Sequence, residues 1–143
     1  MEQFRFPNGP TVTFENRSGL RARKPAGTGL YYADYGNEAV NLRLGLMHMW
    51  SDLGCGNAVG CEEIAVDTRI GRVSFALRKL SRLVSDADIS ASADARPRYQ
   101  YQALAMDKTS RGGSFLSVDI VCATRQACLD QITAMRSLRV VDR

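Results

Sequence analysis

The chain has 143 residues and a formal net charge of +4; 45% of its residues are hydrophobic and 24% are charged. These values are ordinary for a folded globular protein, and they exclude collagen, coiled coils and intrinsic disorder. No stretch approaches the roughly 18 consecutive apolar residues of a membrane span. The length predicts one domain over residues 1–143, since domains commonly have about 100–200 residues.

The first third of the chain predicts short strands separated by turns. Residues 11–15 are rich in β-branched side chains and alternate cleanly, residues 20–24 suggest a short edge strand, and residues 30–35 suggest another strand. Residues 40–50 alternate between a mostly apolar and a mixed face, which favours a strand. A helix is the competing interpretation there, because Leu, Met and Arg are good helix formers.

The middle of the chain is the most ambiguous part. Residues 63–70 alternate as a strand does. Residues 73–84 then carry apolar side chains at spacings of three, four and seven, which predicts an amphipathic helix. The alternative is that residues 73–77 form a strand paired back onto the preceding one. Residues 85–97 are small and polar, and we expect a surface loop.

The last third predicts two strands and a helix. Residues 99–106 have strand character, and residues 114–122 alternate most clearly of all. Thr124 can cap a helix whose apolar stripe runs through Cys128 and Ile132. We therefore expect an α+β fold: a largely antiparallel sheet, an amphipathic helix after mid-chain, and a C-terminal helix packed on the sheet.

Four cysteines form two pairs of identical spacing, Cys55 with Cys61 and Cys122 with Cys128. Matched local pairs predict two disulfides, and hence an oxidising compartment. Free buried thiols rank second. A zinc site ranks third, because structural zinc sites usually have shorter spacing between paired cysteines.

The compartment follows from the cysteines. Residues 1–5 have neither the basic nor the apolar region of a signal peptide. We expect the mature form of a periplasmic or secreted protein in which Met1 replaces the signal peptide. The alternative is a cytoplasmic protein whose cysteines are reduced.

No residue pattern identifies a chemistry. His48 is the only histidine and is interpreted as a half-buried structural residue rather than a catalytic base. Glu62 and Glu63 are adjacent on a strand and should point to opposite faces. No nucleotide-binding glycine motif and no metal-ligand pattern is present. We expect no catalytic residue, no cofactor and no metal.

The basic residues are sixteen arginines and only three lysines. Arginine binds phosphate in a bidentate manner, so a nucleic-acid surface could look like this. The arginines are spread along the chain, whereas nucleic-acid binders usually cluster them. A bias of codon usage is the preferred explanation, and the net charge still favours an acidic partner.

These observations favour a non-catalytic protein-binding domain of the bacterial cell envelope, such as an inhibitor or immunity protein that neutralises a secreted toxin or hydrolase. The alternatives are a small carboxylate-dependent hydrolase and an Arg-rich nucleic-acid-binding domain. Tyrosine and arginine are common anchors at protein interfaces, and the loop of residues 51–60 would be stiffened by a disulfide. The candidate binding residues are Arg21, Arg23, Tyr31, Tyr32, Tyr35 and Asn57.

Overall fold

We describe the protein from a computed structural model, which covers residues 1–7, 9–23, 32–89, 96–107 and 114–141. The strands are β1 (Glu2–Arg5), β2 (Thr11–Phe14), β3 (Arg21–Arg23), β4 (Tyr32–Gly36), β5 (Val40–Met47), β6 (Cys61–Thr68), β7 (Gly71–Ser85), β8 (Pro97–Met106), β9 (Phe115–Cys122) and β10 (Arg139–Val141). The helices are α1 (Asp86–Ile89), α2 (Arg125–Ala134) and the short 3-10 helix η1 (Met135–Ser137).

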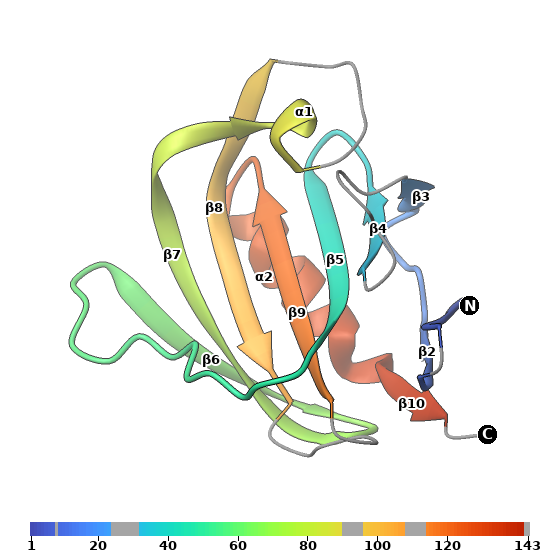
Figure 1. Ribbon diagram of the computed structural model, residues 1–143. Helices are drawn as coiled ribbons and strands as arrows, with labels where there is room; N and C mark the ends of the chain where they lie inside the picture. The colour runs from blue at the N-terminus through green and yellow to red at the C-terminus, as the bar shows by residue number, and fades with distance from the viewer. Residues whose placement is uncertain (8, 24–31, 90–95, 108–113, 142–143) are drawn as a thin grey trace.

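The described strands form two antiparallel sheets (Figure 1). The larger sheet has seven strands in the order β3-β4-β5-β9-β8-β7-β6, and the smaller has the order β1-β2-β10. The predicted antiparallel sheet and C-terminal helix are confirmed. The α+β class is confirmed only loosely, because the protein is mainly β-structure with two short α-helices.

The central strands owe their position to alternation of apolar side chains. Leu42 and Leu44 of β5 are fully buried, and they lie opposite Ile120 and Val118 of β9. A strand presents every second side chain to the same face, so this pairing builds a continuous apolar layer. The competing helix interpretation of this segment is therefore wrong.

The amphipathic helix predicted for residues 73–84 is also wrong, because these residues belong to the long strand β7. Val73, Phe75 and Leu77 are buried at a spacing of two, and β7 pairs with both β6 and β8. The register shifts between Lys79 and Val84. Between those two residues the strand is mostly exposed, so its apolar residues obey no single period and imitate a helical stripe.

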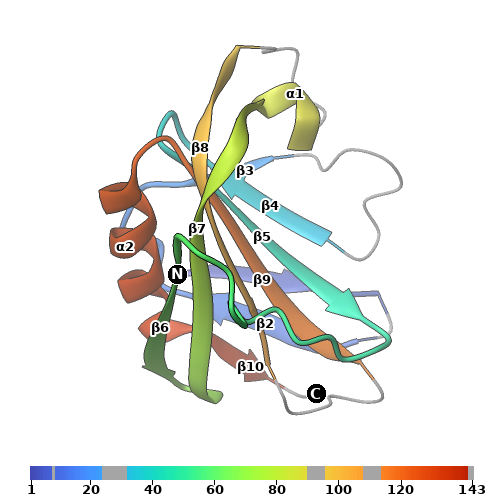
Figure 2. The ribbon, with the colours of Figure 1, turned by 90° about the vertical axis from the view of Figure 1, so that its left-hand side faces the viewer.

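The C-terminal helix begins as its sequence suggests and covers one face of the large sheet (Figure 2). The Thr124 hydroxyl accepts a hydrogen bond from the Ala127 backbone N–H at 3.1 Å, which caps the first turn. Cys128 and Ile132 are buried, and α2 packs on β8 and β9. The smaller sheet covers the same core at its other end, where Phe14 of β2 makes an edge-to-face contact with Tyr35 of β4.

Candidate functional site

The large sheet has one covered and one less covered face. Helix α2 lies on the covered face (Figure 2), and we call the opposite side the open face. The connection from β5 to β6, residues 48–60, crosses in front of β9, β8 and β7 on the side away from α2 (Figure 1). We call this connection the β5–β6 loop.

The loop is held by a disulfide and by hydrogen bonds. Cys55 and Cys61 are bridged, as predicted from their spacing. The backbone N–H of Gly54 donates to Asp52 Oδ1 at 2.9 Å, and that of Cys55 donates to Glu63 Oε1 at 3.2 Å. The loop therefore has a defined shape before it meets any ligand.

The loop nevertheless exposes apolar side chains. Met49 is 78% exposed, Trp50 is 44% exposed and Val59 is fully exposed. Over the described part of the chain the exposed large apolar residues are Met1, Met47, Met49, Trp50, Val59, Leu83 and Val141. Most of them thus lie in the loop or at the end of β5. An exposed apolar group is informative when such groups gather in one segment.

The candidate residues of the loop and of β3 and β4 differ widely in environment. Asn57 and Arg21 are exposed, as a contact residue must be. Tyr32 is half-buried, and its ring centroid lies 5.0 Å from the guanidinium carbon of Arg43. Tyr35 is only 4% exposed. Its ring centroid lies 5.1 Å from that of a phenylalanine of β2, so Tyr35 belongs to the core and offers no surface to a partner.

The candidate Tyr31 lies outside the described residues.

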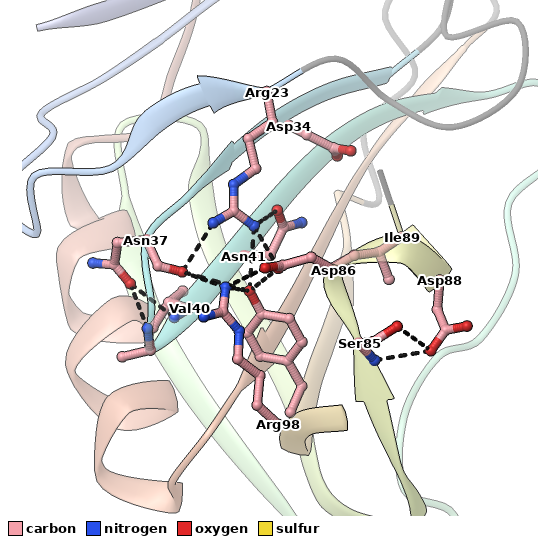
Figure 3. Close-up of polar contacts among 12 residues, drawn as sticks. Arg23, Asp34, Asn37, Val40, Asn41, Ser85, Asp86, Asp88, Ile89 and Arg98 are labelled. Atoms are coloured by element: carbon pink, nitrogen blue, oxygen red, sulfur yellow. Dashed lines mark hydrogen bonds and ion pairs between the residues drawn. The ribbon is translucent and has the colours of Figure 1, made fainter. Parts of the chain in front are cut away.

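Arg23 is also engaged inside the protein (Figure 3). Its guanidinium donates to Asp86 Oδ1 at 2.8 Å and to the Asn37 carbonyl oxygen at 3.0 Å. It passes over Gly36, where an added Cβ would lie 2.6 Å from Arg23 Nε, so a larger residue at this position would displace the guanidinium from its partners. Arg23 therefore ties the edge strand β3 to α1 rather than facing a partner.

Asp86 is the centre of this cluster (Figure 3). Besides Arg23, it accepts hydrogen bonds from Arg98 and from the Tyr99 hydroxyl. Burial alone would raise the pKa of Asp86, but the hydrogen bonds from Tyr99 and Arg98 and the charge of Arg23 outweigh it and hold that pKa below its ordinary value. The carboxylate is thus ionised and joins α1 to β3 and β8.

A second charged group crosses the open face. Asp34, Arg43 and Asp119 lie in register on β4, β5 and β9. Arg43 donates to both oxygens of Asp34, at 2.7 and 2.9 Å, and also to the Ile89 carbonyl oxygen of α1. We call these three side chains the charged row.

Asp119 is the least satisfied member of the charged row. Burial raises its pKa, although a hydrogen bond from Gln102 Nε2 at 3.1 Å and the charge of Arg43 oppose the shift. The cavity beside Asp119 and Arg43 has a volume of about 10 Å³, room for no more than one water molecule. This cavity is too small to hold a substrate.

The other acidic and basic candidates are now placed. Glu62 and Glu63 do point to opposite faces: Glu62 binds Arg125 of α2 in an ion pair of 2.6 Å, whereas Glu63 contacts the loop. His48 is exposed just beyond the end of β5, not half-buried as expected. Among the described residues, no group of three or more His, Cys, Asp or Glu side chains could hold a metal ion.

The second predicted disulfide, between Cys122 and Cys128, is present and joins the end of β9 to α2. Two disulfides are compatible with the predicted oxidising location. Within the described ranges no helix has the length and apolarity needed to cross a membrane.

Comparison with known proteins adds no relative. No family model matches the chain, and no curated protein and no solved structure matches it. Function must therefore be argued from the residues themselves.

Sequence reasoning missed both the Asp86 cluster and the charged row. The sequence signal for the charged row was one polar residue in each of two clearly alternating strands, on the face opposite the apolar residues. These residues are Arg43 in β5 and Asp119 in β9. Alternation marks each as solvent-facing, and only strand pairing brings them together.

Proposed function

We propose that this protein is a non-catalytic protein-binding domain of the bacterial cell envelope that binds its partner through the β5–β6 loop. It acts as an inhibitor or immunity protein against a secreted toxin or hydrolase. The observation that carries the proposal is a cross-linked, hydrogen-bonded loop that leaves Met49 and Trp50 exposed.

The exposed tryptophan and methionine side chains place apolar surface in water, which is unfavourable. A partner that covers them removes this surface from water and so gains binding free energy. Both residue types are enriched at protein interfaces, and tryptophan is among the commonest hot-spot residues. A loop that is already ordered loses less conformational entropy when it binds. The Cys55–Cys61 disulfide and the bonds from Asp52 and Glu63 supply that order.

The envelope location rests on the two disulfides, which persist in oxidising compartments. The net charge of +4 favours an acidic partner, because long-range attraction speeds association. Nucleic acid is less well supported. Arg23 and Arg98 are committed to Asp86, and Arg43 is committed to Asp34, so these arginines do not present their charge to phosphates.

The test compares two double variants that each remove two exposed apolar side chains. Met49→Ser/Trp50→Ser alters the loop, whereas Leu83→Ser/Val141→Ser alters exposed positions elsewhere. Each protein is immobilised and incubated with an envelope extract of the source bacterium. A true partner is retained by the wild type and by the Leu83/Val141 control and is lost from the loop variant.

The affinity of the purified partner should fall at least about 30-fold in the loop variant, which corresponds to about 2 kcal/mol for loss of a hot-spot residue. The control should bind within about twofold of the wild type. Undiminished binding by the loop variant would place the interface elsewhere. A partner that is a nucleic acid would refute the proposal as a whole.

A further inference from the structure

An open groove with a volume of about 590 Å³ lies beneath the first part of the β5–β6 loop. One wall is the loop, and the other is the open face of β6, β7 and the end of β8. Its apolar lining comes from Trp50, Leu53, Ala65 and Met106. Its polar lining comes from Ser51, Asp52, Glu63, Arg72 and Ser74.

Two carboxylates of the groove converge on Gly54. A Cβ built on Gly54 would lie 3.0 Å from Asp52 Oδ1 and 2.7 Å from Glu63 Oε1, so both carboxylate oxygens lie close to this residue. One oxygen of each carboxylate accepts a backbone N–H of the loop. A carboxylate has two oxygens and about four acceptor sites, so each retains capacity for a further donor.

The groove lining also contains one cation, Arg72, which forms an exposed ion pair with Asp67 at 3.3 Å across the β6–β7 hairpin. The two carboxylates of Asp52 and Glu63 outnumber it, so the groove has a negative character on a protein whose net charge is +4. A local charge opposite to the net charge selects what enters the groove, whereas the net charge governs long-range approach.

We propose that the groove binds one basic side chain of the protein partner, and that arginine binds more tightly than lysine. The apolar stem lies along Leu53 and Met106, and the cationic head meets Asp52 and Glu63 beside the ring of Trp50. Long basic side chains bury their stems on apolar surface while their heads remain polar. A guanidinium also stacks on an indole ring and binds carboxylates in a bidentate manner.

This inference rests on the proposed function only in that the occupant belongs to a protein. An acidic partner fits it as well as a basic one, because a single arginine on its surface is sufficient. A second copy of this chain is the competing occupant, since its own arginines could enter the groove.

The probe is a phage-displayed library of random linear peptides, selected on the disulfide-bonded full chain. Selected peptides are titrated against the protein, and binding is followed by the fluorescence of Trp50, the single tryptophan of the chain. The groove variant is Asp52→Asn/Glu63→Gln, which removes both charges but keeps oxygen acceptors for the loop. The matched control is Glu62→Gln/Asp130→Asn, which removes two carboxylates that bond to α2 residues.

We expect the selected peptides to share an arginine whose replacement by citrulline weakens binding at least about tenfold. The groove variant should show a similar loss, and the control should not. Peptides that bind near Trp50 without a basic residue, or equally well to the groove variant, would overturn the inference and leave the loop proposal standing. A library that yields no peptide shifting Trp50 fluorescence counts against both. Concentration-dependent dimerisation abolished in the groove variant would replace the partner by a second copy.

Discussion

The two disulfides close loops of equal length in different environments, so each serves as the control for the other. Both join cysteines six positions apart. In the chain-entropy relation, a loop of this size restricts the unfolded state by about 2.4 kcal/mol, whichever pair closes it. Differences between the pairs must therefore come from the folded state.

The folded environments of the two bridges are unlike. Cys122 and Cys128 are fully buried, whereas Cys55 and Cys61 are only partly buried. Replacing a buried cysteine by alanine also removes one buried sulfur atom, whose burial stabilises the folded state by roughly 0.8 kcal/mol if it is taken as equivalent to a CH₂ group. A cavity left at the site would add to this loss. We expect Cys122→Ala/Cys128→Ala to lower the free energy of unfolding by about 4 kcal/mol. Cys55→Ala/Cys61→Ala should lower it by about 2.4 kcal/mol.

The assay is urea denaturation of each variant, followed by circular dichroism in the absence of reductant. The Cys55/Cys61 variant should also melt about 5–10 °C below the wild type. Equal losses for the two variants, or a greater loss for the Cys55/Cys61 pair, would refute the reasoning from burial.

Two carboxylates should respond to substitution with opposite signs. Asp86→Asn should destabilise the protein by about 3 kcal/mol at pH 7, because Arg23 and Arg98 lose their buried counter-charge. Folding lowers the pKa of Asp86, so its contribution to stability is present above the ordinary carboxyl pKa and is lost only as the pH falls through the lower pKa of the folded state. A destabilisation of less than about 1 kcal/mol by Asp86→Asn at pH 7 would contradict this expectation. Asp119→Asn should instead stabilise the protein by about 1 kcal/mol at pH 7, because the amide still accepts from Gln102 and the desolvated charge of Asp119 is removed. Burial raises the pKa of Asp119, so the advantage should vanish in denaturation curves below the ordinary carboxyl pKa, and an unchanged advantage there would argue against its cause.

Local patterns in the chain predicted those features that depend on neighbouring residues. The alternation in residues 114–122 predicted β9, and the hydroxyl of Thr124 predicted the start of α2. The equal spacing of the cysteines predicted both disulfides, because residues so close in sequence meet in almost any fold. For β7 the local pattern was misleading: residues 81–83 are exposed, so burial imposes no period there.

The environments of individual side chains depended on long-range pairing instead. Alternation placed Tyr35 on a strand, but only the approach of β2 put it in the core. Arg43 and Asp119 each occupy the polar face of a strand, and only the pairing of β5 with β9 makes them neighbours. Strand register sets which side chains share a face, and it depends on the packing of the whole sheet. The sequence by itself thus determined strands such as β9, the start of α2 and the cross-links of this protein, but not β7. The tertiary structure decided which polar residues are buried and which loop faces solvent, because burial is a property of the assembled sheet.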